Sequence, residues 1–169
     1  KLFVKLLLLG SNGQLGWQLQ RSLSPLSEIF ICDRNVVDFR NLDKLKSIVR
    51  KYRPDIIVNA AAYTNVDKSE SDAENAFKVN FEAVELLANE AAILNSWLIH
   101  YSTDYIFDGT KNSPYKEEDK TNPKSVYGKS KLQGELAIID SKCKYLIFRT
   151  SWLYSTYGRN FVNTVLRIA

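Results

Sequence analysis

The sequence predicts an α/β fold, built as a doubly wound parallel sheet with helices on both faces. Short apolar runs alternate five times along the chain with stretches whose apolar residues recur at helical spacing. A glycine-rich segment directly follows the first apolar run, and polar side chains follow the later ones. In such sheets ligands bind at the carboxyl ends of the strands, so these polar positions are candidates for a binding site.

The first apolar run, Val4–Leu9, is interrupted only by Lys5 and predicts a strand that is covered on both faces. It leads into Gly10-Ser11-Asn12-Gly13-Gln14-Leu15-Gly16, which holds three of the seven glycines of the chain. A helical pattern follows and stops near Pro25. A strand, a glycine turn and a helix in this order are typical of a dinucleotide-binding loop. The spacing G-x-x-G-x-x-G differs from the G-x-G-x-x-G fingerprint, and a plain tight turn is the alternative.

A second strand is expected over residues 28–32, and Asp33 and Arg34 follow its end. An acid about 20 residues beyond a glycine loop accepts a hydrogen bond from the ribose 2′-OH of NAD. Arg34 instead favours the 2′-phosphate of NADP, so both cofactors stay open. A solvated turn would explain either residue taken singly.

The next helix is expected over residues 42–52, with Asp38 capping the turn before it. Residues 55–59 then predict a third strand, which runs directly into Ala60-Ala61-Ala62-Tyr63. Small side chains at that point let a cofactor lie close to the backbone. The alternative is that they only allow tight packing where the strand passes into the loop.

A helical region that starts at Asp67 or Ser69 is expected to continue without a break to about Leu94. The fourth strand follows over residues 97–101 and ends in Ser102-Thr103-Asp104-Tyr105. This places hydroxyl groups and a carboxylate at the carboxyl end of a strand, where a ligand would bind.

A polar segment, Gly109 to Lys124, precedes a helix that we expect Ser125 to cap. This helix carries Tyr127 and Lys131, which lie on the same face because they are four residues apart. A phenol beside an ammonium group can donate a proton to a carbonyl and take it back. Taken alone, such a pair is common on solvated helices.

The last strand is expected over residues 145–150 and the last helix over residues 161–168. Because the sequence stops within that helical pattern, we expect it to be the cofactor-binding part, residues 1–169, of a longer chain. No internal repeat or linker interrupts this single domain.

The composition narrows the class of protein. The net charge is +4, and basic residues are interleaved with acids, which argues against a nucleic-acid surface. No apolar stretch approaches the length of about 20 residues that spans a membrane. Two cysteines without metal-ligand spacing favour a cytoplasmic protein with no metal site. The single histidine, His100, is predicted to be partly buried and structural.

Together these motifs resemble the extended short-chain dehydrogenase/reductase superfamily and, within it, the dTDP-4-dehydrorhamnose reductase family. The resemblance covers essentially the whole chain and rests on the order and spacing of the motifs. It implies a Rossmann-like NAD(P)-binding fold, with a C-terminal substrate domain that this sequence lacks. The motifs are Gly10-Ser11-Asn12-Gly13-Gln14-Leu15-Gly16-Trp17, Asn59-Ala60-Ala61-Ala62-Tyr63-Thr64, Val66-Asp67-Lys68-Ser69-Glu70, His100-Tyr101-Ser102-Thr103-Asp104-Tyr105, Tyr127-Gly128-Lys129-Ser130-Lys131 and Arg149-Thr150-Ser151-Trp152.

The resemblance also assigns roles to residues of this sequence. The implied catalytic residues are Thr103, Tyr127 and Lys131, and the implied substrate contacts are Thr103, Asp104 and Trp152. The implied cofactor-binding residues are Gly10, Asn12, Gly13, Gln14, Leu15, Gly16, Asp33, Asp38, Phe39, Ala61, Ala62, Tyr63, Tyr127 and Lys131. Asn80 matches a helix asparagine that supports a proton relay in the wider superfamily.

The implied reaction is reduction by NADPH or NADH of the C4 ketone of dTDP-4-dehydro-L-rhamnose, a dTDP-sugar. Tyr127 would donate the proton, Lys131 would lower the pKa of Tyr127 and hold the nicotinamide ribose, and Thr103 would orient the ketone. The resemblance also allows a homodimer, whereas no nucleic acid or membrane partner is indicated.

Two other functions stay open. A nucleotide-sugar dehydratase or epimerase is one, although dehydratases carry an Asp-Glu pair after the threonine and Tyr105 stands in place of the second acid. The other is a non-catalytic regulatory subunit, because the regulatory subunit of methionine adenosyltransferase resembles the same reductases.

Overall fold

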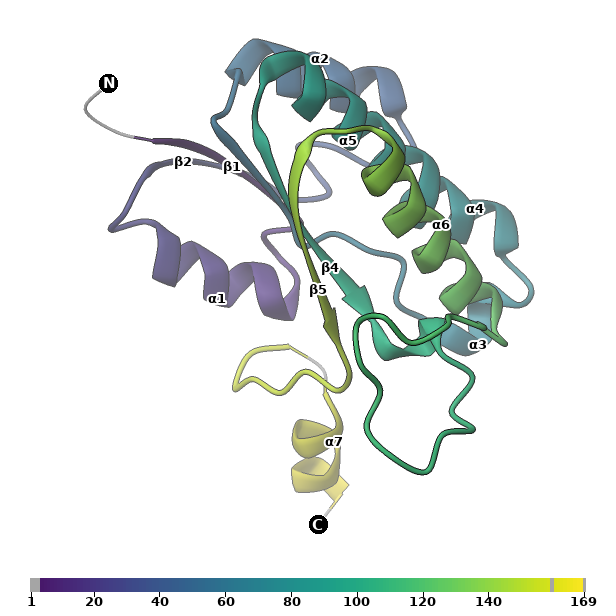
Figure 1. Ribbon diagram of the computed structural model, residues 1–169. Helices are drawn as coiled ribbons and strands as arrows, with labels where there is room; N and C mark the ends of the chain where they lie inside the picture. Colours follow the sequence, from purple (N-terminus) through teal and green to yellow (C-terminus); the bar gives the residue numbers. More distant parts are fainter. Residues whose placement is uncertain (1–3, 159, 169) are drawn as a thin grey trace.

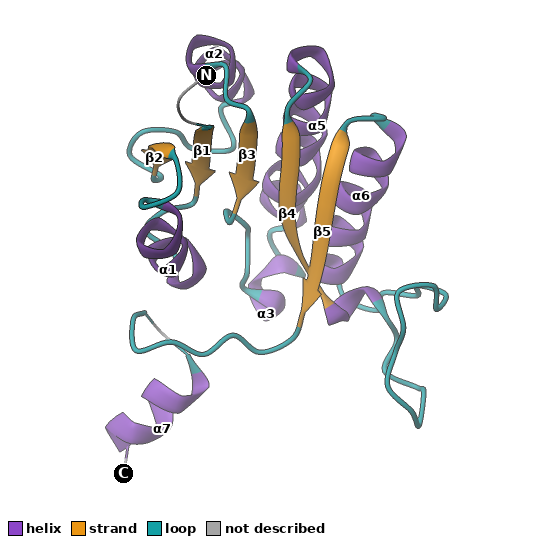
Figure 2. Ribbon diagram, turned by 60° about the vertical axis from the view of Figure 1, so that its left-hand side comes forward, coloured by secondary structure: helices purple, strands orange, loops and turns teal. Residues whose placement is uncertain are grey.

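The computed structural model describes residues 4–158 and 160–168. Its centre is a parallel sheet of five strands in the order β2-β1-β3-β4-β5 (Figure 2). The strands are β1 (Lys5–Leu9), β2 (Glu28–Cys32), β3 (Ile56–Asn59), β4 (Trp97–Thr103) and β5 (Lys144–Thr150). This confirms the predicted fold. The strand order reverses beside β1, and ligands of doubly wound sheets bind at such a point.

Helices cover both faces of the sheet (Figure 1). Helix α1 (Gln14–Leu23) packs on one face, where Leu19 and Leu23 contact a cluster of buried strand residues. Helices α2 (Leu42–Tyr52), α5 (Ala83–Leu94) and α6 (Val126–Asp140) cover the other face and enclose the larger core. The α1 face is less covered towards β5, where Leu146 and Phe148 are each 47% exposed.

The region before α5 differs from the predicted single helix. It consists of α3 (Val66–Ser69), α4 (Ala73–Phe77) and a π-helical turn, η1 (Lys78–Glu82), which runs into α5. Asn65 caps α3 by accepting a hydrogen bond from the Lys68 N–H at 2.9 Å, so neither Asp67 nor Ser69 begins the helix. Helical spacing in a sequence does not reveal this π-turn, because a single turn of five residues is too short to show a period of its own.

Two predicted caps are found at their places. Asp38 closes the turn before α2 by accepting from the Arg40 N–H at 2.9 Å, while Asn41 caps the helix itself. The Ser125 hydroxyl accepts from the Gly128 N–H at 3.0 Å and begins α6. The remaining elements are a 3-10 turn, η2 (Asp104–Ile106), and α7 (Phe161–Ile168).

Candidate active site

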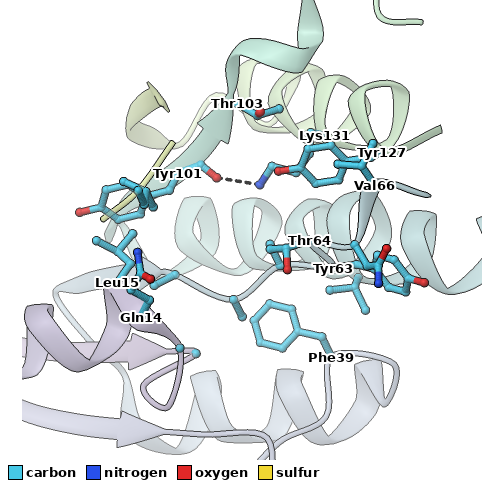
Figure 3. A pocket seen from close by; sticks show the side chains of 18 of the residues that line it. Gln14, Leu15, Phe39, Tyr63, Thr64, Val66, Tyr101, Thr103, Tyr127 and Lys131 are labelled. Atoms are coloured by element: carbon cyan, nitrogen blue, oxygen red, sulfur yellow. Dashed lines mark hydrogen bonds between the residues drawn. The ribbon is translucent and has the colours of Figure 1, made fainter. Parts of the chain in front are cut away.

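A cavity of about 1100 Å³ lies at the carboxyl ends of the strands. Figure 3 shows Thr103, Tyr127 and Lys131 on one side of it, across from Phe39 and Thr64. Every residue to which the resemblance assigned a role in catalysis, cofactor binding or substrate binding lines this cavity, except Gly16 and Asn80. The strands and helices therefore bring together residues that are separated by more than a hundred positions in the sequence.

The glycine loop is packed so closely that side chains would not fit in it. Gly10 has φ +80°, and a Cβ there would lie 2.5 Å from the Ala61 backbone nitrogen. Gly16 is buried, and its Cβ would lie 2.1 Å from the Gly10 carbonyl oxygen, so its role is to let α1 pack on the loop. Gly13 precedes helix α1 as its N-cap and makes no side-chain cap, which leaves backbone N–H groups for an anion.

At the end of β2 the carboxylate of Asp33 holds the turn together. It accepts hydrogen bonds from the Asn12 side chain at 2.7 Å and from the backbone N–H groups of Asn35 and Val36 at 2.8 and 3.0 Å. These bonds, that of Val36 foremost, lower the pKa of Asp33. Most acceptor positions of this carboxylate are thus already used within the protein.

Two arginines border the same end of the cavity. Arg40 pairs with Asp38 through a 2.6 Å hydrogen bond from Nη2, which is the main reason that the pKa of Asp38 lies well below its ordinary range. Arg34 lies 3.4 Å from the same carboxylate, and its side chain is 75% exposed. Both guanidinium groups stand beside the Asp38 carboxylate, and with Asp33 this end holds two arginines and two carboxylates.

The π-helical turn places Asn80 inside the molecule rather than in the cavity. Its side chain accepts from the Tyr63 N–H at 2.9 Å and donates to the Tyr63 carbonyl at 3.0 Å. The amide also donates to the Ser130 hydroxyl at 3.0 Å, next to Lys131 on α6. Asn80 therefore ties the Tyr63 segment to α6 through Ser130, the residue before Lys131. Its role in a proton relay stays a prediction.

Thr103 and Tyr127 meet at the end of β4. The Thr103 hydroxyl accepts from the Tyr105 N–H at 3.2 Å, and a hydrogen bond joins it to the Tyr127 side chain. The pKa of Tyr127 is raised, chiefly by burial and further by Asp104 and Tyr105, and the Thr103 bond lowers it only in part. The expectation that Lys131 lowers this pKa is not met in the structure, because burial outweighs the other effects.

Lys131 is one of the most deeply buried side chains, with 1% exposure. Its Nζ donates to the Tyr101 carbonyl at 2.7 Å, the bond drawn in Figure 3, and lies 3.2 Å from Nε2 of His100. Burial lowers the pKa of Lys131 to about 8, against the opposing effect of Glu135. Glu135 is itself paired with Arg149 at 2.8 Å.

Sequence reasoning missed several residues of the site. Asn160 and Phe161 line the cavity from the segment after β5, and the Asn160 side chain donates to Gln14 at 3.0 Å. The Tyr101 carbonyl holds Lys131, and no side-chain pattern reveals a backbone contact. His100 is fully buried rather than partly so, and it contacts Lys131.

Metal-binding clusters and membrane-spanning helices are both absent from residues 4–158 and 160–168. No group of three or more His, Cys, Asp or Glu side chains is arranged to hold a metal ion there. Across the same residues, no helix has the length and apolar character needed to cross a membrane.

Solved structures of similar proteins share the fold of this chain. A dTDP-4-dehydrorhamnose reductase from Bacillus anthracis, solved in complex with NADP, is 37% identical with a TM-score of 0.95 and covers 99% of this chain. A reductase of the same name from Clostridium acetobutylicum is 38% identical with a TM-score of 0.93 over 97% of this chain. The present chain covers 60% and 59% of those two chains.

Curated relatives carry the same name. The dTDP-4-dehydrorhamnose reductase of Salmonella typhimurium is 49% identical over 170 residues, and that of Burkholderia thailandensis is 48% identical over 166 residues. Each alignment covers 98% of this chain, which spans only 57% and 56% of the two relatives. The family model described as the RmlD substrate binding domain matches residues 4–169. With a match over nearly its whole length, this chain belongs to the RmlD substrate binding domain family.

Proposed function

We propose that the protein reduces the C4 ketone of dTDP-4-dehydro-L-rhamnose to the alcohol of dTDP-L-rhamnose, with NADPH as the reductant. The observation that carries this proposal is the meeting of Thr103, Tyr127 and Lys131 in one cavity with the glycine loop. The names of the relatives support the substrate, and the NADP complex of the Bacillus anthracis protein supports the cofactor.

The residues fit a dinucleotide because the Gly10 and Gly16 positions leave no room for a Cβ and bring backbone N–H groups to the cavity. Bound NADPH would supply the hydride. Tyr127 acts as the acid that protonates the ketone oxygen, and its raised pKa keeps the phenol protonated near neutral pH. The Thr103 hydroxyl orients the same oxygen, and Lys131 holds hydroxyl groups of the nicotinamide ribose.

The end of the cavity at β2 favours NADPH over NADH in this proposal. The Asp33 carboxylate already accepts bonds from Asn12, Asn35 and Val36, so it has little capacity left for ribose hydroxyls. Arg34 and Arg40, which stand beside Asp38 at the same end of the cavity, are exposed and can donate to a 2′-phosphate.

Two features weigh against a dehydratase and against a non-catalytic regulatory subunit. A dehydratase needs a second acid after Thr103, and Tyr105 stands there, with its ring 5.7 Å from that of Tyr127 in an edge-to-face arrangement. A regulatory subunit would not need Thr103, Tyr127 and Lys131 side chains directed at one cavity. Both points support catalysis by a reductase.

The test is an assay of NADPH oxidation by the whole protein with dTDP-4-dehydro-L-rhamnose, followed by absorbance and product analysis. Consumption of NADPH together with formation of dTDP-L-rhamnose is the expected result. No oxidation, despite tight binding of NADPH, would contradict the proposal and favour a regulatory role. If NADPH were oxidised only with a different sugar nucleotide, that nucleotide would be the substrate in place of dTDP-4-dehydro-L-rhamnose.

The proposal extends to the organisation of the protein. Residues 1–169 form the cofactor-binding domain of a cytoplasmic enzyme, and a second domain supplies most contacts to the sugar nucleotide. A homodimer is the proposed assembly. Light scattering on the whole protein measures the molar mass, and a mass of one chain would exclude the dimer.

A further inference from the structure

We propose that Trp17 and Tyr157 are positioning residues, whose stacked rings fix the segment after β5 on helix α1 and thereby place Trp152 in the cavity. The segment after β5 comprises residues 151–158. The significance for catalysis rests on the proposed function, because Trp152 is an implied substrate contact. The docking of the segment can be tested without any substrate. Neither Trp17 nor Tyr157 received a role from the sequence motifs.

The segment after β5 crosses the carboxyl ends of the strands. It leaves β5, the edge strand of the sheet, and runs in Figure 2 below the strands towards α1, which packs against β1 and β2. Trp152, Leu153 and Gly158 line the cavity, so the segment forms one of its walls. Except for Ser155, residues 151–158 are exposed, so burial does little to hold the segment in place.

One face of α1 is suited to hold this segment. Gln14, Trp17 and Gln18 stand at the spacing i, i+3 and i+4, which puts their side chains on the same face of the helix. Leu19 and Leu23 lie on the face that packs against the sheet. The start of α1 therefore presents polar and aromatic side chains to a segment that lies outside the sheet.

The contact between the two rings is close and nearly parallel. The centroids of Trp17 and Tyr157 lie 4.8 Å apart, with an interplanar angle of 7°. The guanidinium carbon of Arg21 lies 4.8 Å from the centroid of the Trp17 ring, and this cation–π contact helps to hold that ring. The stack therefore joins the segment after β5 to the first turns of α1.

Hydrogen bonds beside the stack link the same two parts of the chain. The Gln18 amide donates to the Ser155 hydroxyl at 3.0 Å, and the Asn160 amide donates to Oε1 of Gln14 at 3.0 Å. Gly158 has φ +82°, a conformation that favours glycine, and a Cβ there would lie 3.4 Å from the Gln14 Cβ. The segment is thus attached to α1 at several points.

Bonds within the segment and to the start of α7 make it a compact turn. The Tyr157 N–H donates to the Ser155 hydroxyl at 3.1 Å, and the Asn160 amide donates to the Ser155 carbonyl at 2.7 Å. The Asn163 amide donates to the carbonyls of Ser155 and Gly158, at 3.1 Å in each case. A turn that is bonded internally is positioned as a unit, so its contacts with α1 decide where it stands.

The consequence concerns Trp152. Its ring meets that of Phe161 edge to face, with the centroids 6.0 Å apart, and both residues line the cavity. Phe161 directly follows Asn160, which is bound to Gln14. The first turn of α1 thus faces the cofactor through the glycine loop and the substrate through the segment after β5. Loss of the stack should displace Trp152 and weaken substrate binding, while the proton donor stays in place.

The first test measures KM and kcat for dTDP-4-dehydro-L-rhamnose in the whole protein. Tyr157→Ala should raise KM by about two- to ten-fold, which corresponds to the loss of one stacked pair. The change in kcat should be smaller than the change in KM. Tyr157→Phe keeps the ring and should have the KM of the wild type. An unchanged KM in Tyr157→Ala, or an equal rise in Tyr157→Phe, would overturn the proposal.

A second variant tests the partner ring. Trp17→Leu removes the same stack from the side of α1, so the double variant with Tyr157→Ala should raise KM no further than the larger single effect. Effects that multiply would show that the two rings act independently and would contradict the proposal.

The matched control is Tyr154→Ala, the same change in the same segment, at a residue that is 58% exposed and does not line the cavity. It should leave KM as in the wild type. A rise in KM equal to that of Tyr157→Ala would show that the stack is not what positions the segment.

Amide hydrogen exchange in the whole protein measures the docking without substrate. Residues 151–158 should exchange about two- to ten-fold faster in Tyr157→Ala than in the wild type. The strands β1 and β3 should exchange alike in both proteins, which shows that the fold is intact. Equal exchange of residues 151–158 in the two proteins would overturn the proposal. Because exchange needs no turnover, a protein with the expected exchange but no reductase activity would contradict only the proposed function.

Discussion

The two ends of the cavity hold their polar side chains in different ways. At the β2 end, Asp33 and Asp38 are bound mainly by groups two or three residues away, and the paired Arg40 side chain is 47% exposed. At the β4 end, the contacts of Asn80 and Lys131 reach Ser130 and His100, which are 50 and 31 residues away in sequence. These four side chains are almost completely buried.

This difference suggests that the two ends of the cavity have different functions. Exposed pairs are worth little individually and rearrange easily, so the β2 end can adapt to the nucleotide that it selects. Buried polar groups are costly to leave unpaired, so the β4 end is rigid and holds the proton donor in place. Variants at the two ends should therefore affect different quantities, and the following predictions run from the largest effect to the smallest.

Tyr127→Phe removes the proton donor at the β4 end. Turnover in the NADPH oxidation assay should fall by about 10²- to 10⁴-fold. Since the ring remains, the Tyr105 contact and the fold should persist. Turnover near the wild-type value would show that another group donates the proton.

Asn80→Ala leaves the Tyr63 N–H and carbonyl without their partner. The free energy of unfolding should fall by about 1–3 kcal/mol, measured by denaturant titration. The matched control is Asn75→Ala, because the Asn75 amide donates to Asp72, three residues away, at 2.7 Å. Equal losses in both variants would remove the distinction between buried long-range bonds and local ones.

Arg40→Gln removes a charge from the β2 end. The Kd of NADPH should rise about ten-fold, while that of NADH should stay unchanged. Lys51→Gln removes a charge from an exposed position on α2 and should change neither Kd. Equal weakening of both cofactors would mean that Arg40 does not contact the 2′-phosphate.

Asp38 should make stability depend on pH in a narrow acidic range. Its pKa is lowered in the folded protein, so its contribution is present above the unfolded pKa of about 4 and is lost as pH falls towards the folded value. The difference in Tm between the wild type and Asp38→Asn should shrink below about pH 4. A difference that is constant with pH would show that the charge of Asp38 does not stabilise the fold.

The same contrast explains how much the sequence could predict. The strands, Ser125 as a cap and the glycine loop depend on neighbours in sequence, and each was found where it was predicted. The positions of Asn59, His100 and Asn80 depend on strand pairing and on a π-turn. The lowered pKa of Lys131 was missed for the same reason, since the burial of its side chain and its contacts with β4 exist only in the folded chain.

The central claim is that one end of the cavity selects the cofactor and the other carries out the chemistry. The most direct test measures kcat and the Kd of NADPH for Tyr127→Phe and Arg40→Gln side by side in the whole protein. We predict that Tyr127→Phe lowers kcat at an unchanged Kd, whereas Arg40→Gln raises the Kd at a nearly unchanged kcat. A variant that changes both quantities together would contradict the claim.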